Sequence, residues 1–240
     1  MNWALPEITE ALRDATPARI LASRAGTRPT TAELLRFQVD HACARDAVRT
    51  LVDHELPSRL DCVLELHSAA RDKTEYLLDP GVGRKLRIGE DERLIAELPR
   101  APQVLVAIGD GLSSAAVETQ VPILLPALLD CLRAEGFESI AGPVYIHLAR
   151  VGVLDALGEV VHPDVGILLV GERPGLATAQ SLSAYLGFQP RLGRTDADRN
   201  VLSNIHEGGV PPLEAAAVVA GWARSMLRQG KSGVGFRPEG

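Results

Sequence analysis

The feature that most constrains the fold is an unbroken apolar run, Val165 to Val170, followed at once by Gly-Glu-Arg-Pro-Gly at residues 171 to 175. A strand that is apolar at every position is typical of a parallel sheet covered on both faces. The two glycines and the proline end this strand and leave Glu172 and Arg173 just beyond its carboxyl end. Open α/β sheets bind ligands at that edge, so Glu172 is a candidate site residue. The alternative is a solvated turn in which Glu172 and Arg173 form a local ion pair.

From residue 103 onward, apolar strands alternate with helical segments. The runs Val104 to Ile108 and Val144 to Leu148 are expected to be buried strands. Helices are expected from about residue 114 to 135, over 153–160 and over 213–229. Pro122 and Pro126 disturb the pattern of the first of these helices. A loop is expected after Gly187 through Asp198. This alternation predicts an α/β fold with a mostly parallel sheet and right-handed crossovers.

The first hundred residues are expected to be helical. A short helix is predicted around residues 6 to 14, and Thr30-Thr-Ala-Glu33 has the capping-box pattern of a long helix. One face of that helix carries an apolar stripe formed by Phe37, His41, Ala44, Val48, Leu51 and Val52. On such a stripe, a core or interface role for His41 is favoured over a ligand role. The prolines at 99 and 102 suggest a hinge, which divides the chain into a helical domain (1–98) and a sheet domain (99–240).

Composition excludes several functional classes. With 46% apolar residues the 240-residue chain can bury a sizeable core, and its net charge of −6 and 4% aromatic content do not favour nucleic-acid binding. Three cysteines at wide spacing do not predict a disulfide framework or a metal site, so reduced thiols in a cytosolic protein are expected. No signal-peptide pattern or membrane-length apolar run is found, so no membrane partner is expected.

A basic segment spans residues 71 to 85 and mixes turn-forming residues with arginine and lysine. It can be a solvated loop. It can also be a surface that contacts a partner or an anionic group. The sequence alone leaves both interpretations open.

Two other chemical signatures are present in partial form. Ser113 lies in a strand-turn-helix context, and Asp164 and His206 follow it in the order a serine hydrolase would use. A helix-capping serine is the simpler interpretation of Ser113. The stretch Gly109 to Ser114 partly matches the dinucleotide fingerprint, but it lacks the third glycine. A hydrolase and a nucleotide-binding module therefore remain as alternative hypotheses.

Several motifs taken together resemble one family, the small (light) subunit of ethanolamine ammonia-lyase. The resemblance covers roughly residues 18 to 235. In the first part of the chain it rests on Glu33-Leu-Leu-Arg-Phe37, Asp40-His-Ala42, Arg45-Asp-Ala-Val48, Asp72-Lys73, Tyr76-Leu77 and Gly83-Arg84. In the second part it rests on Asp110-Gly-Leu-Ser113, Gly171-Glu-Arg-Pro-Gly-Leu176, Ser203-Asn-Ile-His206 and Pro211-Pro-x-Glu214.

The resemblance implies a Rossmann-like domain that helps to hold adenosylcobalamin, preceded by a smaller helical domain. It further implies a hetero-oligomer with a large subunit that contains the substrate site, where ethanolamine is converted to acetaldehyde and ammonia. Cofactor contacts are implied for Val151, Glu172 and Val201. Family members vary at the position of Val201, so a backbone contact is expected there. No catalytic residue and no metal ligand are expected on this chain.

The resemblance also bears on cofactor form and location. The motif D-x-H-x-x-G, by which other cobalamin proteins replace the lower cobalt ligand with histidine, is absent from the sequence. This agrees with base-on binding, in which the cofactor keeps its dimethylbenzimidazole. A cytoplasmic location is expected, with a bacterial microcompartment as the alternative. Encapsulated relatives often carry a longer N-terminal segment than the about thirty residues before the first long helix here.

Overall fold

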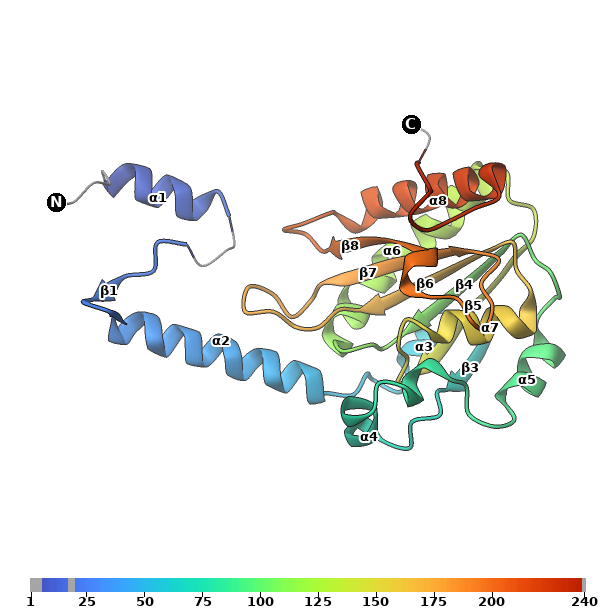
Figure 1. Cartoon of the computed structure of the whole chain (residues 1–240), viewed down its shortest axis with the longest axis horizontal. Helices are drawn as coiled ribbons and strands as arrows, with labels where there is room; N and C mark the ends of the chain where they lie inside the picture. Colours follow the sequence, from blue (N-terminus) through green and yellow to red (C-terminus); the bar gives the residue numbers. More distant parts are fainter. Residues whose placement is uncertain (1–5, 17–19, 239–240) are drawn as a thin grey trace.

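The structure is a computed structural model that describes residues 6–16 and 20–238. The prediction that no signal peptide is present rests partly on Met1 to Leu5, which lie outside the described residues. Its centre is a six-stranded sheet in the order β3-β5-β4-β6-β7-β8 (Figure 1). The strands are β3 (Leu64–His67), β4 (Val104–Gly109), β5 (Ile140–His147), β6 (Val165–Gly171), β7 (Leu182–Phe188) and β8 (Arg199–Ile205). The pairs β3–β5, β5–β4 and β4–β6 are parallel, whereas the pairs β6–β7 and β7–β8 are antiparallel. The predicted α/β fold with a mostly parallel sheet is confirmed.

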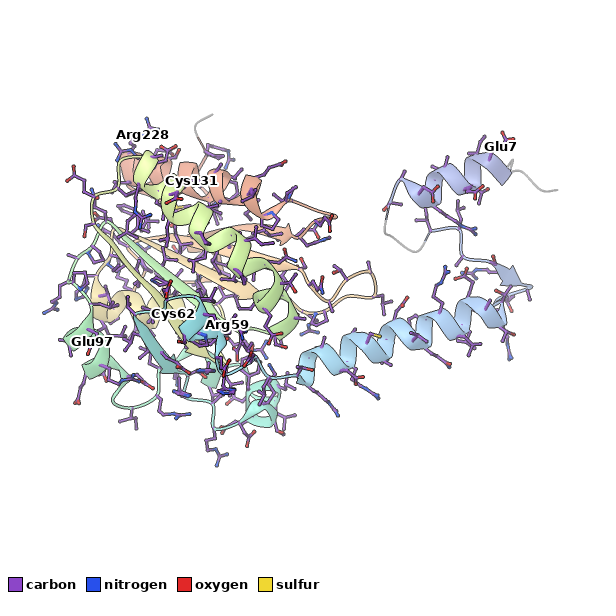
Figure 2. The ribbon with its side chains drawn as sticks, turned by 180° about the vertical axis from the view of Figure 1, so that it is seen from behind. Glu7, Arg59, Cys62, Glu97, Cys131 and Arg228 are labelled. Atoms are coloured by element: carbon purple, nitrogen blue, oxygen red, sulfur yellow. The ribbon has the colours of Figure 1, made fainter. Side chains whose placement is uncertain are left out.

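Helices cover both faces of this sheet (Figures 1 and 2). The helices are α1 (Pro6–Asp14), α2 (Thr31–Arg49), α3 (Leu56–Arg59), α4 (Lys73–Leu78), α5 (Glu90–Glu97), α6 (Ser114–Ala134), α7 (Val153–Val161) and α8 (Pro212–Gln229), with 3-10 turns η1 (Val82–Arg84) and η2 (Asp196–Asp198). Helices α6 and α8 pack together on one face, where they share an apolar core with β4, β6 and β7. Helices α5 and α7 form the second core on the other face. A small hairpin, β1 (Arg24–Ala25) with β2 (Arg28–Pro29), precedes α2.

The two central strands of the sheet, β4 and β6, are its most deeply buried part. Every residue of β4 and of β6 is buried, as expected for apolar strands with helices on both faces. Helix α6 is long and apolar enough by composition to span a membrane. Nine of its residues are buried against the sheet and α8, so core packing accounts for its apolar character. Pro122 and Pro126 lie inside α6 without ending it.

Three sequence predictions need correction. The segment before residue 98 is not purely helical, because β3 pairs in parallel with β5 at the edge of the sheet. The expected loop does extend through Asp198, but the sequence did not predict strand β8, which begins at Arg199 and pairs with β7. Thr30 precedes α2 as expected, but its side chain makes no capping hydrogen bond. The division of the chain at residues 98 and 99 stays a prediction.

Helix α2 extends away from the sheet, with α1 beyond it (Figure 1). None of its residues is buried. Phe37 and His41 of the expected apolar stripe are exposed, whereas Ala44 and Val48 are partly covered. Within the described chain His41 is therefore not a core histidine, and an interface role stays a prediction.

The three cysteines are separate free thiols. Cys43 is exposed on α2, and Cys62 and Cys131 are partly buried. Figure 2 shows Cys131 on α6 and Cys62 at a different place beside the sheet. Burial raises the pKa of the Cys62 thiol to about 12, so this side chain stays protonated at neutral pH.

Candidate functional site

A pocket of about 430 Å³ opens at the carboxyl ends of β4, β5 and β6. Strands β4 and β5 are neighbours, but the helices that follow them, α6 and α7, lie on opposite faces of the sheet. The two loops therefore diverge and leave a crevice, which is the usual ligand position in such folds. Val151, Glu172 and Val201 all line this pocket. We call it the cofactor pocket after the contacts that the family resemblance implies for these three residues.

Glu172 connects the ends of three strands. It follows β6 directly, and its Oε1 accepts a hydrogen bond from the hydroxyl of Ser183 on β7 (2.5 Å). The same oxygen accepts a second hydrogen bond from the backbone N–H of Asn204 on β8 (2.9 Å). Oε2 has no hydrogen bond among the described residues, so it remains available to a donor in the pocket. The other interpretation of this motif was a solvated turn with a local ion pair. Among the described residues, Glu172 bonds to Ser183 and Asn204 and forms no ion pair with Arg173.

Val201 lies on strand β8, beyond the expected end of the loop at Asp198. It pairs directly with Tyr185 of β7, so both side chains lie on the same face of the sheet. Ser183 and Ser203, two residues along each strand, lie on that face as well and also line the pocket. Val201 is 42% exposed, so its side chain as well as its backbone borders the open space.

The loop that carries Val151 is held by Asp110, the first residue after β4. Its two carboxylate oxygens accept hydrogen bonds from the backbone N–H groups of Leu148 (2.9 Å) and Ala149 (3.0 Å). Burial raises the pKa of Asp110, while these two amides and the nearby Lys73 ammonium act in the opposite direction. Asp110 thus joins the end of β4 to the loop after β5 and fixes the crevice between them.

A second support comes from α4. The buried Tyr76 donates a hydrogen bond from its hydroxyl to the carbonyl of Ala149 (3.0 Å). The guanidinium of Arg150 lies 4.1 Å from the centre of the Tyr76 ring, and its Nη2 donates to the Tyr76 carbonyl (3.0 Å). Gly83 approaches so closely that an added Cβ would lie 2.6 Å from Cγ of Arg150. Tyr76 and Gly83 are therefore packed against the pocket, whereas residues 78–81 between them are exposed.

The three residues of the hydrolase hypothesis do not meet. The Ser113 hydroxyl caps α6 by accepting from the Ala116 N–H (3.1 Å) and donates to the Ala179 carbonyl. Asp164 precedes β6, at the opposite end of this seven-residue strand from Ser113, which corresponds to roughly 20 Å. His206 accepts from the Gly208 N–H at Nδ1 (3.1 Å), so Nε2 carries the proton and donates to Asn204 Oδ1 (2.8 Å). This histidine has no free acceptor with which to activate Ser113.

The glycines of the nucleotide-binding hypothesis have a packing explanation. A Cβ on Gly111, whose φ is +61°, would lie 2.3 Å from the carbonyl oxygen of Gly171. A Cβ on Gly109 would lie 2.6 Å from the Cβ of Ala149. Both glycines allow close approach of neighbouring chain segments, so they do not indicate a phosphate-binding turn.

At about 430 Å³ the cofactor pocket can receive only part of a large ligand with a polar rim. It is open to one side, and its wall combines Val151, Val170 and Val201 with the carboxylate of Glu172. A corrin ring has an apolar macrocycle surrounded by amide side chains, so these residue types fit it. Among the described residues, no group of three His, Cys, Asp or Glu side chains is arranged to bind a metal ion.

Sequence reasoning missed several residues of this site. Asp110 carries a signal that was available, because it directly follows a buried strand as Glu172 does. Arg150 carries the same signal, because it follows the expected strand that ends at Leu148. Tyr76 and Tyr185 carry no such signal, since only the three-dimensional arrangement of α4 and β7 brings them to the pocket.

The family comparison covers nearly the whole chain. Residues 6–237 of the 240-residue chain match the family described as ethanolamine ammonia-lyase light chain (EutC). The match includes every element that lines the cofactor pocket, together with α1 and α2. This chain therefore belongs to the ethanolamine ammonia-lyase light-chain family.

Proposed function

We propose that this chain contacts adenosylcobalamin in its base-on form and completes the cofactor site of ethanolamine ammonia-lyase together with a large subunit. The observation that carries the proposal is the meeting of Val151, Glu172 and Val201 in one pocket at the carboxyl ends of the parallel strands. These three residues are separated by 21 and 29 positions in the sequence. Chance would not be expected to place them on one crevice.

The chain's own residues bind and orient the cofactor. Val151 and Val201 offer apolar contact, and Glu172 Oε2 accepts a hydrogen bond from an amide on the corrin rim. When bound, adenosylcobalamin supplies the radical chemistry of the reaction. No nucleophile with a free base lies among the residues that line the cofactor pocket. The substrate site is accordingly assigned to the large subunit.

Helix α2 supports the existence of this partner. A 19-residue helix with no buried residue gains little stability from its own chain. Leu35 and Val39 are 55% and 61% exposed and lie one turn apart on the same side. The large subunit is the partner that family membership implies, and we assign it to this surface. A cytoplasmic location fits this function, and a microcompartment remains the alternative.

Co-purification tests the proposal. The light chain, the large subunit and their mixture are each passed over a sizing column after incubation with adenosylcobalamin. The visible absorption of the corrin should elute with the mixture and be strongly reduced with either subunit alone. Acetaldehyde should form from ethanolamine only in the mixture. Equal cofactor retention by the large subunit alone, or acetaldehyde production by the light chain alone, would contradict the proposal.

A further inference from the structure

A second pocket of about 390 Å³ adjoins the cofactor pocket, and its lining includes three arginines and one carboxylate, that of Asp196. Arg150, Val151, Tyr185 and Val201 line both pockets, so a single ligand can extend from one into the other. The additional wall is formed by η1 and by the start of β8, which contribute Arg84 and Arg199. We call this space the arginine pocket.

The three arginines of this pocket differ in their ion pairing. Arg199 is already neutralised, because its Nη2 lies 3.1 Å from a carboxylate oxygen of Asp155 and 3.5 Å from one of Asp196. Neither Arg84 nor Arg150 forms an ion pair with a carboxylate in the described part of the chain. Two positive charges in this pocket therefore have no anionic partner.

Packing holds the aliphatic part of the exposed Arg84 and the guanidinium of Arg150. The aliphatic part of Arg84 lies against Gly152, where an added Cβ would be 3.0 to 3.2 Å from its Cβ, Cγ and Cδ atoms. Arg150 is held over the Tyr76 ring, and its backbone N–H donates to the Gly83 carbonyl (2.7 Å). Its Nε is buried and has no hydrogen-bond partner among the described residues.

We infer that the arginine pocket receives a phosphate group, and that this phosphate is the phosphodiester in the nucleotide tail of the cobalamin bound in the adjoining pocket. The inference rests on the proposed function. Guanidinium groups match phosphate oxygens in geometry and charge. In a base-on cobalamin the tail leaves the corrin on the face opposite the adenosyl group. Under the proposed function the large subunit holds the substrate beside the adenosyl group, which leaves the face that carries the tail to this chain.

The test compares two corrinoids. Adenosylcobinamide has the same corrin ring and adenosyl group as adenosylcobalamin but lacks the nucleotide tail and its phosphate. Dissociation constants for both are measured by visible absorption on the complex of the two subunits. The substitution is Arg84→Gln, and Lys85→Gln is the matched control, because Lys85 is an exposed cation on the same segment that does not line the pocket.

Arg84→Gln should weaken adenosylcobalamin binding by about 10-fold, which corresponds to one charge-assisted hydrogen bond, and should leave adenosylcobinamide binding unchanged. Lys85→Gln should change neither constant by more than about 2-fold, since a solvated charge contributes little. Added inorganic phosphate should compete with adenosylcobalamin but not with adenosylcobinamide.

Three outcomes would overturn the inference. Equal weakening of both corrinoids would show that Arg84 acts on the corrin or on the fold. No change in either constant would show that Arg84 does not contact the tail. Phosphate that raises the melting temperature of the cofactor-free complex in an Arg84-dependent way, with unchanged cobalamin affinity, would assign the pocket to free phosphate. Each of these outcomes can be told apart from failure of the proposed function. In that case neither corrinoid would bind, whereas here adenosylcobinamide still binds.

Discussion

The carboxylate of Glu172 accepts a hydrogen bond from the backbone N–H of Asn204, 32 residues later in the chain. Asn204 has a φ of +61°, a left-handed conformation that asparagine adopts more readily than most residues. Its carbonyl accepts from the Val210 N–H (2.9 Å), so the turn that follows β8 is fixed on both sides. One oxygen of Glu172 thus organises the rim of the cofactor pocket, and the other has no hydrogen-bond partner among the described residues.

Glu172→Ala should weaken adenosylcobalamin binding to the two-subunit complex by about 10-fold to 150-fold, since a hydrogen bond to a charged acceptor contributes roughly 1.5–3 kcal/mol. The maximal rate at saturating cofactor should change little. Glu172→Gln should give an intermediate affinity, because it retains one acceptor oxygen without the charge. Titration with adenosylcobalamin measures both the apparent cofactor constant and the maximal rate.

Ser183→Ala is the control for this experiment. It removes the Oγ donor to Glu172 Oε1 and leaves the carboxylate in place. Its effect on cofactor affinity should be several-fold smaller than that of Glu172→Ala. If the two substitutions weaken binding equally, Glu172 acts by holding β7 and not by contacting the cofactor.

The double substitution of Leu35 and Val39 by Glu tests the assignment of α2 to the large subunit. Both side chains are more than half exposed, so the stability of the isolated chain should change by no more than about 0.5 kcal/mol. Loss of two apolar contacts should weaken association with the large subunit by about 10-fold to 100-fold. Ile88→Glu is the control, since Ile88 is a fully exposed apolar residue outside α2. Unaltered association of the double variant would remove α2 from the interface.

Much of the sheet could be predicted because the central strands carry a strong signal. β4 and β6 are apolar at nearly every position, which is a direct consequence of burial on both faces. β3 has only four residues, and two of them, Glu65 and His67, are not fully buried, so no long apolar run marks it. β8 has mostly exposed or half-exposed residues, because it forms an edge of the sheet and borders the pocket. Its polar composition therefore looks like a loop in the sequence.

The site was predictable to a smaller extent. Glu172 could be identified from its place after a buried strand, whereas Val151 and Val201 were implied only by the family resemblance. Arg84 belongs to a basic segment for which contact with an anionic group was one of two interpretations, and that role stays a prediction. Its meeting with Arg150, 66 positions later, depends on the crossover that places β5 beside β3. Local patterns do not encode such long-range pairings.

Gly111→Ala should be strongly destabilising. An alanine there would adopt a left-handed conformation and place its Cβ 2.3 Å from the Gly171 carbonyl oxygen, inside van der Waals contact. The expected loss of unfolding free energy is about 3 kcal/mol or more, measured by urea denaturation. Gly193→Ala is the matched control, because Gly193 also has a positive φ (+88°) but has no atom within 4 Å of an added Cβ. Gly193→Ala should lower the unfolding free energy by only about 1–2 kcal/mol, which is the cost of the left-handed backbone conformation without a steric clash. Equal losses for the two variants would show that the approach of the β4 loop to β6 is not tightly constrained.

Asp155→Asn should change how stability depends on pH. Burial raises the pKa of Asp155 from its usual value to about 6, although the Arg199 guanidinium acts in the opposite direction. Between about pH 4 and pH 6 the folded protein therefore binds more protons at this group than the unfolded chain does. As the pH rises through this range, the contribution of Asp155 to the unfolding free energy falls by about 2 to 3 kcal/mol.

The asparagine variant lacks this titration, so its stability relative to the unsubstituted protein should increase by that amount between pH 4 and pH 6.5. Urea denaturation at several pH values measures the difference and cancels the contributions of all other groups. Asp196→Asn is the control, because Asp196 also lies near Arg199 (3.5 Å) but is 81% exposed; its stability difference should stay below about 1 kcal/mol throughout. A difference for Asp155→Asn that does not vary with pH would mean that this carboxylate is ionised in the folded protein across the whole range.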